Sequence, residues 1–174
     1  MGQQAIEFQQ IMIHYIPNED RIVMRLNSSD DQQFAVAFSR RFVKTFWGPL
    51  IYVLSADPKF SAYDEATKQA AMEFKNEEIM SKADKATPFK LEGVTYPWGK
   101  DPLVVTKAIV KNPEGALPIL GLYAENDLGF EFPSNHHVLH YLYKAIMNMM
   151  KDTGWDLDLH QLAQSMPKDK NKLN

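Results

Sequence analysis

The chain has 174 residues and a formal net charge of −3 at pH 7, with 45% hydrophobic and 24% charged residues. This length suits one domain, and the composition lies in the globular range, far from that of disordered chains. Cysteine is absent, which excludes disulfides, thiol catalysis and Cys-ligated metal sites. The acidic balance lowers the expectation of a nucleic-acid binder, because such proteins usually carry a basic footprint.

The first part of the chain predicts three strands followed by a helix. Apolar and polar residues alternate in three stretches separated by turns rich in Asn and Asp. These stretches cover residues 6–16, 21–26 and 33–38. Ser39 is expected to cap a helix whose apolar stripe runs through residues 42–54. Pro49 should kink this helix or begin a second one.

The middle of the chain, residues 56–102, is predicted to be an insert. Residues 63–85 have the pattern of a charged amphipathic helix, and residues 87–102 form a loop rich in Pro and Gly. The loop keeps several aromatic residues, so we expect it to be ordered. Residues 91–96 could add one more short strand.

The last part of the chain repeats the order of the first. Strands are predicted at residues 104–110, 117–123 and 128–132. Pro118 cannot donate to a strand ladder, so its strand should lie at an edge or begin pairing after the proline. Ser134 or Asn135 should cap the next helix, Gly154 should end it, and a short helix should follow near residues 160–166.

Together these elements predict an α+β fold, with an antiparallel sheet of about six to eight strands built from two tandem βββα units and a linking helix. The units cover residues 5–55 and 103–150, joined by the helical and Pro/Gly loop insert 56–102. A single domain is expected over residues 1–166, with a disordered tail at 167–174. In architecture, tandem sheet-plus-helix units resemble the plan of Whirly-type single-strand binders, a resemblance that transfers no site residue.

We expect a cytoplasmic protein with no membrane partner. The first residues lack the basic and apolar regions of a signal peptide. The longest strongly apolar stretch, around residues 46–54, is interrupted by Gly48 and Pro49 and is too short to span a bilayer.

Basic residues near the first helix form one candidate site for phosphate or nucleic acid. They are Arg21, Arg25, Arg40, Arg41 and Lys44. The first two share the outer face of the second strand, and the other three lie where free helix N–H groups assist anion binding. The alternative is a solvated surface, which is the commoner fate of arginine on an outer sheet face.

Two histidines form a candidate metal site. His136 and His140 are four residues apart on a predicted helix, so both rings could reach one ion, with Asp156, Asp158 and His160 as further ligands. The glutamate of the HExxH motif is missing and the third ligand is not specified. Chance clustering of exposed histidines near a helix start is the alternative.

Three aromatic residues are candidates for partner binding. Tyr96 and Trp98 lie on the Pro/Gly loop, and Trp155 follows the last main helix. Aromatic rings anchor partners well because they bury a large area at little entropic cost. The alternative for the loop is that it folds over one end of the sheet and plugs the core.

The sequence contains no Gly-rich phosphate loop, nucleophile elbow, kinase signature or dinucleotide fingerprint. The first functional hypothesis is therefore a non-enzymatic binding or assembly module, a homo-oligomer or the partner of another protein, without a cofactor. Two alternatives stay open: a single-stranded nucleic-acid-binding protein that uses the Arg21 and Arg25 face, and a metal-dependent enzyme that uses the histidine cluster. The sequence names no ligand.

Overall fold

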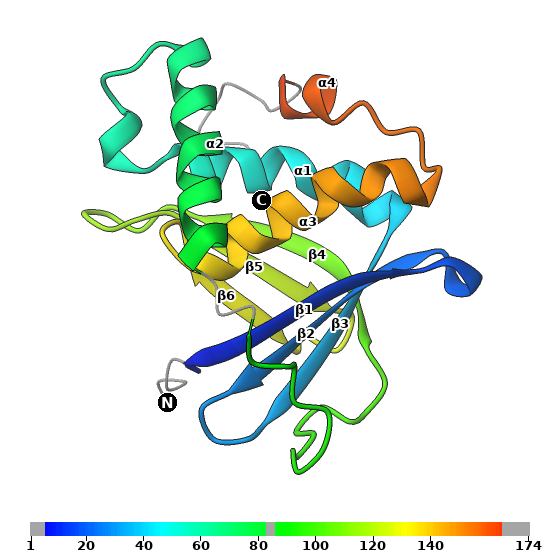
Figure 1. Ribbon diagram of the computed structural model, residues 1–174. Coiled ribbons are helices and arrows are strands. Elements are labelled where there is room, and N and C mark those ends of the chain that lie inside the picture. The colour runs from blue at the N-terminus through cyan, green and yellow to red at the C-terminus, as the bar shows by residue number, and fades with distance from the viewer. Residues whose placement is uncertain (1–5, 83–85, 165–174) are drawn as a thin grey trace.

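The computed structural model describes residues 6–82 and 86–164. In this part of the chain, helices cover one face of a six-stranded sheet, which gives an α+β fold (Figure 1). The strands are β1 (Phe8–Ile16), β2 (Arg21–Ser28), β3 (Gln33–Ser39), β4 (Leu103–Lys111), β5 (Ile119–Ala124) and β6 (Gly129–Pro133). The α-helices are α1 (Arg40–Ser55), α2 (Glu65–Lys82), α3 (His137–Thr153) and α4 (Leu159–Gln164), and short 3₁₀ helices cover Pro17–Glu19 and Pro58–Phe60.

The sheet is mixed, so the prediction of a purely antiparallel sheet is wrong. Its strands follow one another in chain order, and the pairs within β1–β3 and within β4–β6 are antiparallel. Strands β3 and β4 are parallel, with Val36 opposite Leu103 and Ala37 opposite Val104. The cause is the connection: α1 and residues 56–102 form a long crossover, which returns the chain to start β4 in the direction of β3.

The core lies between the sheet and the helices. Alternate residues of β2 and β3 face it, and α1 packs its apolar stripe against them. The core-facing residues of the two strands are Ile22, Met24, Leu26, Phe34, Val36 and Phe38, and Val23, Ala35 and Ala37 between them are buried as well. Trp47 of α1 stacks on Tyr143 of α3 with ring centroids 5.3 Å apart, so the two main helices share the same core.

The two main helices differ from the prediction in detail. Ser39 caps α1 as expected, since its hydroxyl accepts the N–H of Phe42 at 3.2 Å, and α1 then runs unbroken through Pro49. The alternative of two separate helices is therefore wrong. The cap of α3 is His136, whose Nδ1 accepts the N–H of Val138 at 3.2 Å, and not Ser134 or Asn135.

The reason for the shifted cap lies in the preceding strand. The N–H of Ser134 donates to the carbonyl of Pro118 at 2.8 Å, which keeps Ser134 at the end of the β5–β6 pair. Pro118 itself precedes β5, so pairing begins after the proline, as predicted. Gly154, with φ of 63°, ends α3.

The loop before β4 contains one backbone bridge in place of the strand predicted at residues 91–96, because only Thr95 pairs, with Gln32. No helix in residues 6–82 and 86–164 combines the length and the apolar character needed to cross a bilayer. The tail predicted at 167–174 lies outside the described residues.

Candidate functional site

Strand β1 forms an open edge of the sheet. It pairs with β2 on one side, and no strand of the described chain pairs with it on the other. Its nine residues include no Lys, Arg, Asp, Glu or Pro. Burial, and then the charge of Arg25, lower the pKa of His14, which keeps this ring neutral at pH 7. Soluble proteins usually protect such an edge with charges, prolines or a short strand.

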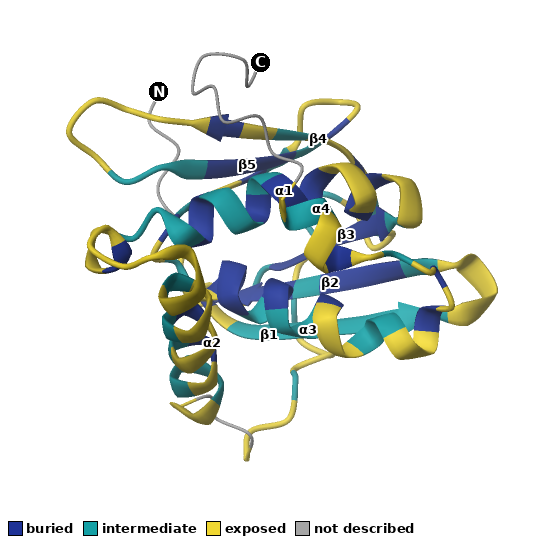
Figure 2. Cartoon of the chain, turned by 90° about the horizontal axis from the view of Figure 1, so that it is seen from above, coloured by how far each residue is buried: buried dark blue, intermediate teal, exposed yellow. Residues whose placement is uncertain are grey.

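Both faces of β1 are half-buried (Figure 2). Ile11, Ile13 and Tyr15 lean on the core, so the alternate residues Met12 and His14 lie on the outer face of the sheet. The strand therefore offers uncharged side chains on both faces, beside a row of backbone N–H and C=O groups that no described strand pairs. We call this open side of Phe8–Ile16 the β1 edge.

A cleft of about 1170 Å³ adjoins the first half of the β1 edge. Its walls come from β1, the end of β2, helices α2 and α3, and the loop before β4. The residues that line it are Gln9, Gln10, Ile11, Asn27, Ser28, Asp31, Met80, Thr87, Pro88, Phe89, Lys90, Leu91, Glu92, His137 and Tyr141. We call it the β1 cleft.

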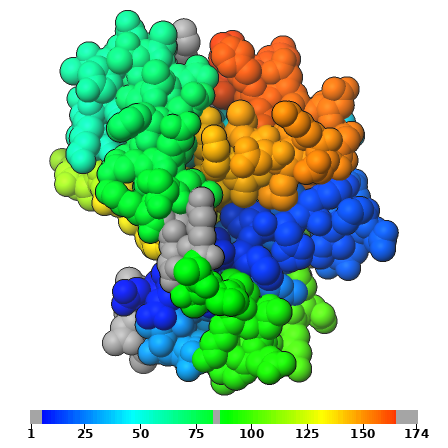
Figure 3. All heavy atoms as spheres, in the orientation of Figure 1, coloured from blue at the N-terminus to red at the C-terminus, as the bar shows by residue number. Residues whose placement is uncertain are grey.

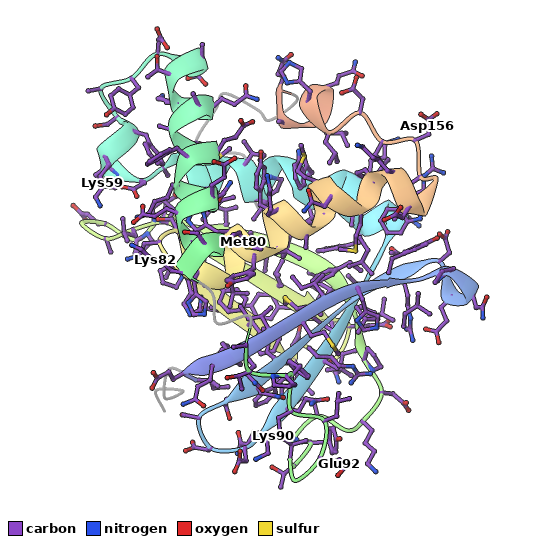
Figure 4. All side chains as sticks on the ribbon, in the orientation of Figure 1. Lys59, Met80, Lys82, Lys90, Glu92 and Asp156 are labelled. Carbon is purple, nitrogen blue, oxygen red and sulfur yellow. The ribbon has the colours of Figure 1, made fainter. Side chains whose placement is uncertain are left out.

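The β1 cleft crosses the edge of the sheet. In Figure 4, Met80 of α2 lies on the helical side of β1, and Lys90 and Glu92 of the loop lie on the opposite side. On α3, His137 and Tyr141 are one helical turn apart and line the cleft together. The space-filling view shows β1 at the surface, between α3 and the loop (Figure 3).

Amide side chains fix the loop wall of the cleft. Gln10 donates to the carbonyl of Pro88 at 3.0 Å and accepts the N–H of Lys90 at 2.9 Å. Asn27 donates to the carbonyl of Lys90 at 2.9 Å, and its own oxygen accepts from Gln33 at 3.0 Å. Asn27 and Gln33 are buried, so breaking these bonds would leave buried polar groups without hydrogen-bond partners, which is unfavourable. The wall is therefore held in place without a ligand.

The chemistry of the cleft suits an uncharged polypeptide better than a phosphate. Lys90, the one lysine or arginine among the described residues that line the cleft, pairs with Asp31 at 2.6 Å, and Glu92 adds a second carboxylate. The remaining walls carry amides, hydroxyls and apolar or aromatic groups. Backbone groups and side chains of an added strand match such a surface.

The structure distributes the predicted basic residues over two places. Arg21 pairs with Glu19, and Arg25 donates to Gln33 at 3.3 Å on the outer face of the N-terminal strands. Arg40, Arg41 and Lys44 lie exposed at the start of α1, where no carboxylate in residues 6–82 and 86–164 comes within ion-pair distance. These three form a basic patch, and none of them lines the β1 cleft.

The predicted partner-binding aromatics lie mainly inside the molecule. Trp98 packs on Phe34 and Phe130 with centroids 4.8 and 4.6 Å away, so the loop closes one end of the core. Trp155 is 2% exposed, and its indole N–H donates to Asp20 at 2.6 Å. Tyr96 is half-buried beside Lys100, whose ammonium lies 5.5 Å from the ring centroid.

The two predicted metal ligands serve different contacts. His136 caps α3, while His140 is buried and its Nδ1 bonds the side-chain oxygen of Asn76 on α2. Asp156 and His160 follow the far end of α3, whose 17 residues span about 25 Å. In the described part of the chain, no three His, Asp or Glu side chains are grouped closely enough to hold a metal ion.

Acid should destabilise the fold through His140. Burial, and then the charge of Lys75, lower its pKa to about 4 from an ordinary value of 6.5. The unfolded chain therefore binds a proton more readily, and stability is full above pH 6.5 and falls as the pH drops toward 4. We expect a loss on the order of 1–3 kcal/mol from this group. Urea unfolding from pH 7 to 4 measures it.

The matched variant for this experiment is His140→Gln, which keeps a side-chain donor for Asn76 and removes the titration. Its stability should fall less steeply over the same pH window. His136, whose burial also lowers its pKa to about 4, supplies part of the remaining slope. A slope equal to that of the wild type would show that His140 does not titrate as a buried group.

Sequence reasoning missed the β1 edge and the amides of the β1 cleft. The sequence does show that Phe8–Ile16 contains no charged residue, but this indicates a pairing surface only once β1 is known to be an edge strand. Gln10, Asn27 and Gln33 had the pattern of ordinary outward-facing polar residues.

The chain matches no protein-family model, and no curated protein or solved structure shows a significant similarity to it.

Proposed function

We propose that the chain is a non-enzymatic binding and assembly module that forms homo-oligomers through the β1 edge. The observation that carries the proposal is a nine-residue edge strand without a charge or a proline. Such an edge is a template for pairing with another chain. The partner supplies backbone groups for the free row of donors and acceptors.

The physical gain comes from two sources. Pairing satisfies the free N–H and C=O groups of the edge in a shared ladder, and it removes half-buried apolar side chains such as Met12 and Ile13 from water. Because β1 is uncharged, a second copy meets no electrostatic repulsion along the strand. The preformed wall of the β1 cleft lowers the ordering cost of binding.

A lysine on the β1 edge should prevent assembly. We expect the wild-type chain to sediment as an oligomer and Met12→Lys to weaken association by about 100-fold or more, because like charges brought together in an interface cost several kcal/mol. Analytical ultracentrifugation over a concentration series measures the effect. Ile109→Lys is the control, since Ile109 is 38% exposed on the internal strand β4.

Two results would contradict the proposal. One is a monomeric wild type at every concentration tested. The other is an equal loss of association in Met12→Lys and Ile109→Lys, which would trace the effect to net charge and not to the edge.

The basic patch of Arg40, Arg41 and Lys44 favours one alternative, the binding of single-stranded nucleic acid. Phosphate contacts release counterions, so a labelled oligonucleotide should then bind with a steep salt dependence that is lost when the three residues become alanine. The metal-dependent enzyme has weaker support, because His136 and His140 have separate contacts.

A further inference from the structure

Resting on the proposed function, we infer that the assembly is a closed dimer in which β1 pairs antiparallel with β1 of a second copy about a two-fold axis. The axis is perpendicular to the sheet and passes through the β1 edge. The six-stranded sheet then continues across both copies, with the helices of both on the same face.

The two edges of the sheet are unequal, and this inequality selects a closed dimer. The opposite edge strand, β6, has five residues, and it carries the exposed Glu131 and ends in Pro133, which has no N–H to donate. Pairing of β1 with β6 of a second copy would be a head-to-tail contact, which leaves a free edge at each end and grows into a filament unless its rotation closes a ring. The short, charged, proline-ended β6 disfavours that arrangement. Pairing of β1 with β1 leaves neither β1 edge free.

The sequence of β1 is compatible with pairing to itself. In an antiparallel pair, residues directly opposite each other share a face of the sheet. Ile11, Ile13 and Tyr15 therefore meet only residues of the core face, and Met12 and His14 meet only residues of the outer face. No opposed pair brings two charges together, because the strand contains none at neutral pH.

The antiparallel arrangement also explains the position of the β1 cleft. Gln9, Gln10 and Ile11 line the cleft at the beginning of the strand. With the axis near the middle of β1, the end of the partner's strand comes to lie beside these residues, at the mouth of the cleft. The partner thus contributes a wall, and each dimer contains two such completed clefts.

The absence of cysteine makes the geometry directly testable. Single cysteines are placed in turn at the five positions Gln10, Ile11, Met12, Ile13 and His14, and Ile109→Cys on β4 is the control. Each step away from a two-fold axis separates the two copies of a residue by about 7 Å along the strands. A disulfide needs Cα atoms within about 7 Å, so only the position nearest the axis should cross-link efficiently.

After mild oxidation, we expect one strong maximum of disulfide-linked dimer within positions 10–14 on non-reducing gels, and a mass in ultracentrifugation that does not exceed two chains. Equal cross-linking at all five positions would indicate parallel, in-register pairing and overturn the inference. So would a mass that grows with concentration, or the absence of any cross-link in a protein that still associates. The proposed function would survive those results if Met12→Lys alone abolished association, so the two failures are distinguishable.

Discussion

Replacing Trp155 with alanine is expected to lower the free energy of unfolding by about 3–5 kcal/mol. The side chain is 2% exposed, and its ring meets Tyr15 edge-on with centroids 5.9 Å apart. The indole N–H and the Tyr15 hydroxyl both donate to Asp20 at 2.6 Å, which ties the segment after α3 to the turn between β1 and β2. Truncation leaves a cavity and removes a hydrogen bond of that carboxylate.

Urea denaturation at pH 7 measures the effect, and two variants frame it. Trp155→Phe keeps most of the apolar volume and loses the indole donor, so it should cost less than the alanine variant. Phe74→Ala removes an aromatic ring that is 72% exposed on α2, and it should change stability by no more than about 0.5 kcal/mol. Equal losses for Trp155→Ala and Phe74→Ala would show that Trp155 is not a core residue.

The sequence could not separate these two roles of a tryptophan. Trp155 follows a glycine in a short polar segment, a setting that is equally typical of an exposed anchor. Its burial depends on Asp20, which lies 135 residues earlier and accepts its N–H. The turn between the first two strands was predicted from its Asn and Asp residues, but the left-handed φ of 49° at Asp20 was not.

Local periodicity predicted most of the elements correctly. The alternation in β2 and β3 and the helical stripe of α1 depend on residues close in sequence, and each was found where expected. The direction of β4 relative to β3 depends on the path of the long connection, which carries no local signal. The relation of the two βββ-plus-helix blocks as copies of one unit stays a prediction.

The candidate site was harder to predict than the fold because edge status is a property of strand order. Nothing within Phe8–Ile16 tells whether β1 has one neighbour or two. The same holds for Gln10 and Asn27, whose amides contact a loop about 60 to 80 residues later in the chain. The sequence shows that this strand has no charged residue. That feature matters only because the order of the strands makes β1 an edge.

The second large effect is expected at the opposite edge of the sheet, where Gly129→Ala should cost about 3 kcal/mol or more. A Cβ on Gly129 would lie 2.0 Å from the carbonyl oxygen of Leu122 and 2.8 Å from the Cα of Tyr123. These two obstacles are backbone atoms of β5, the strand that pairs with β6, and the ring atom Cδ1 of Tyr123 is a third at 2.7 Å. The clash with the backbone atoms can be relieved only by moving the two strands apart, which weakens their ladder.

A second glycine provides the matched control, because its obstacle is a side chain. A Cβ on Gly121 would meet three atoms of the Tyr123 ring and hydroxyl, the nearest at 2.5 Å. Combining Gly121→Ala with Tyr123→Leu should therefore recover the stability of Tyr123→Leu alone, whereas Gly129→Ala should stay destabilising in that background. Thermal unfolding of the wild type, of the single variants Gly121→Ala, Tyr123→Leu and Gly129→Ala, and of the two double variants measures both differences. Rescue of Gly129→Ala by Tyr123→Leu would contradict this prediction. It would show that the Tyr123 ring, and not the close approach of the two strands, requires glycine at position 129.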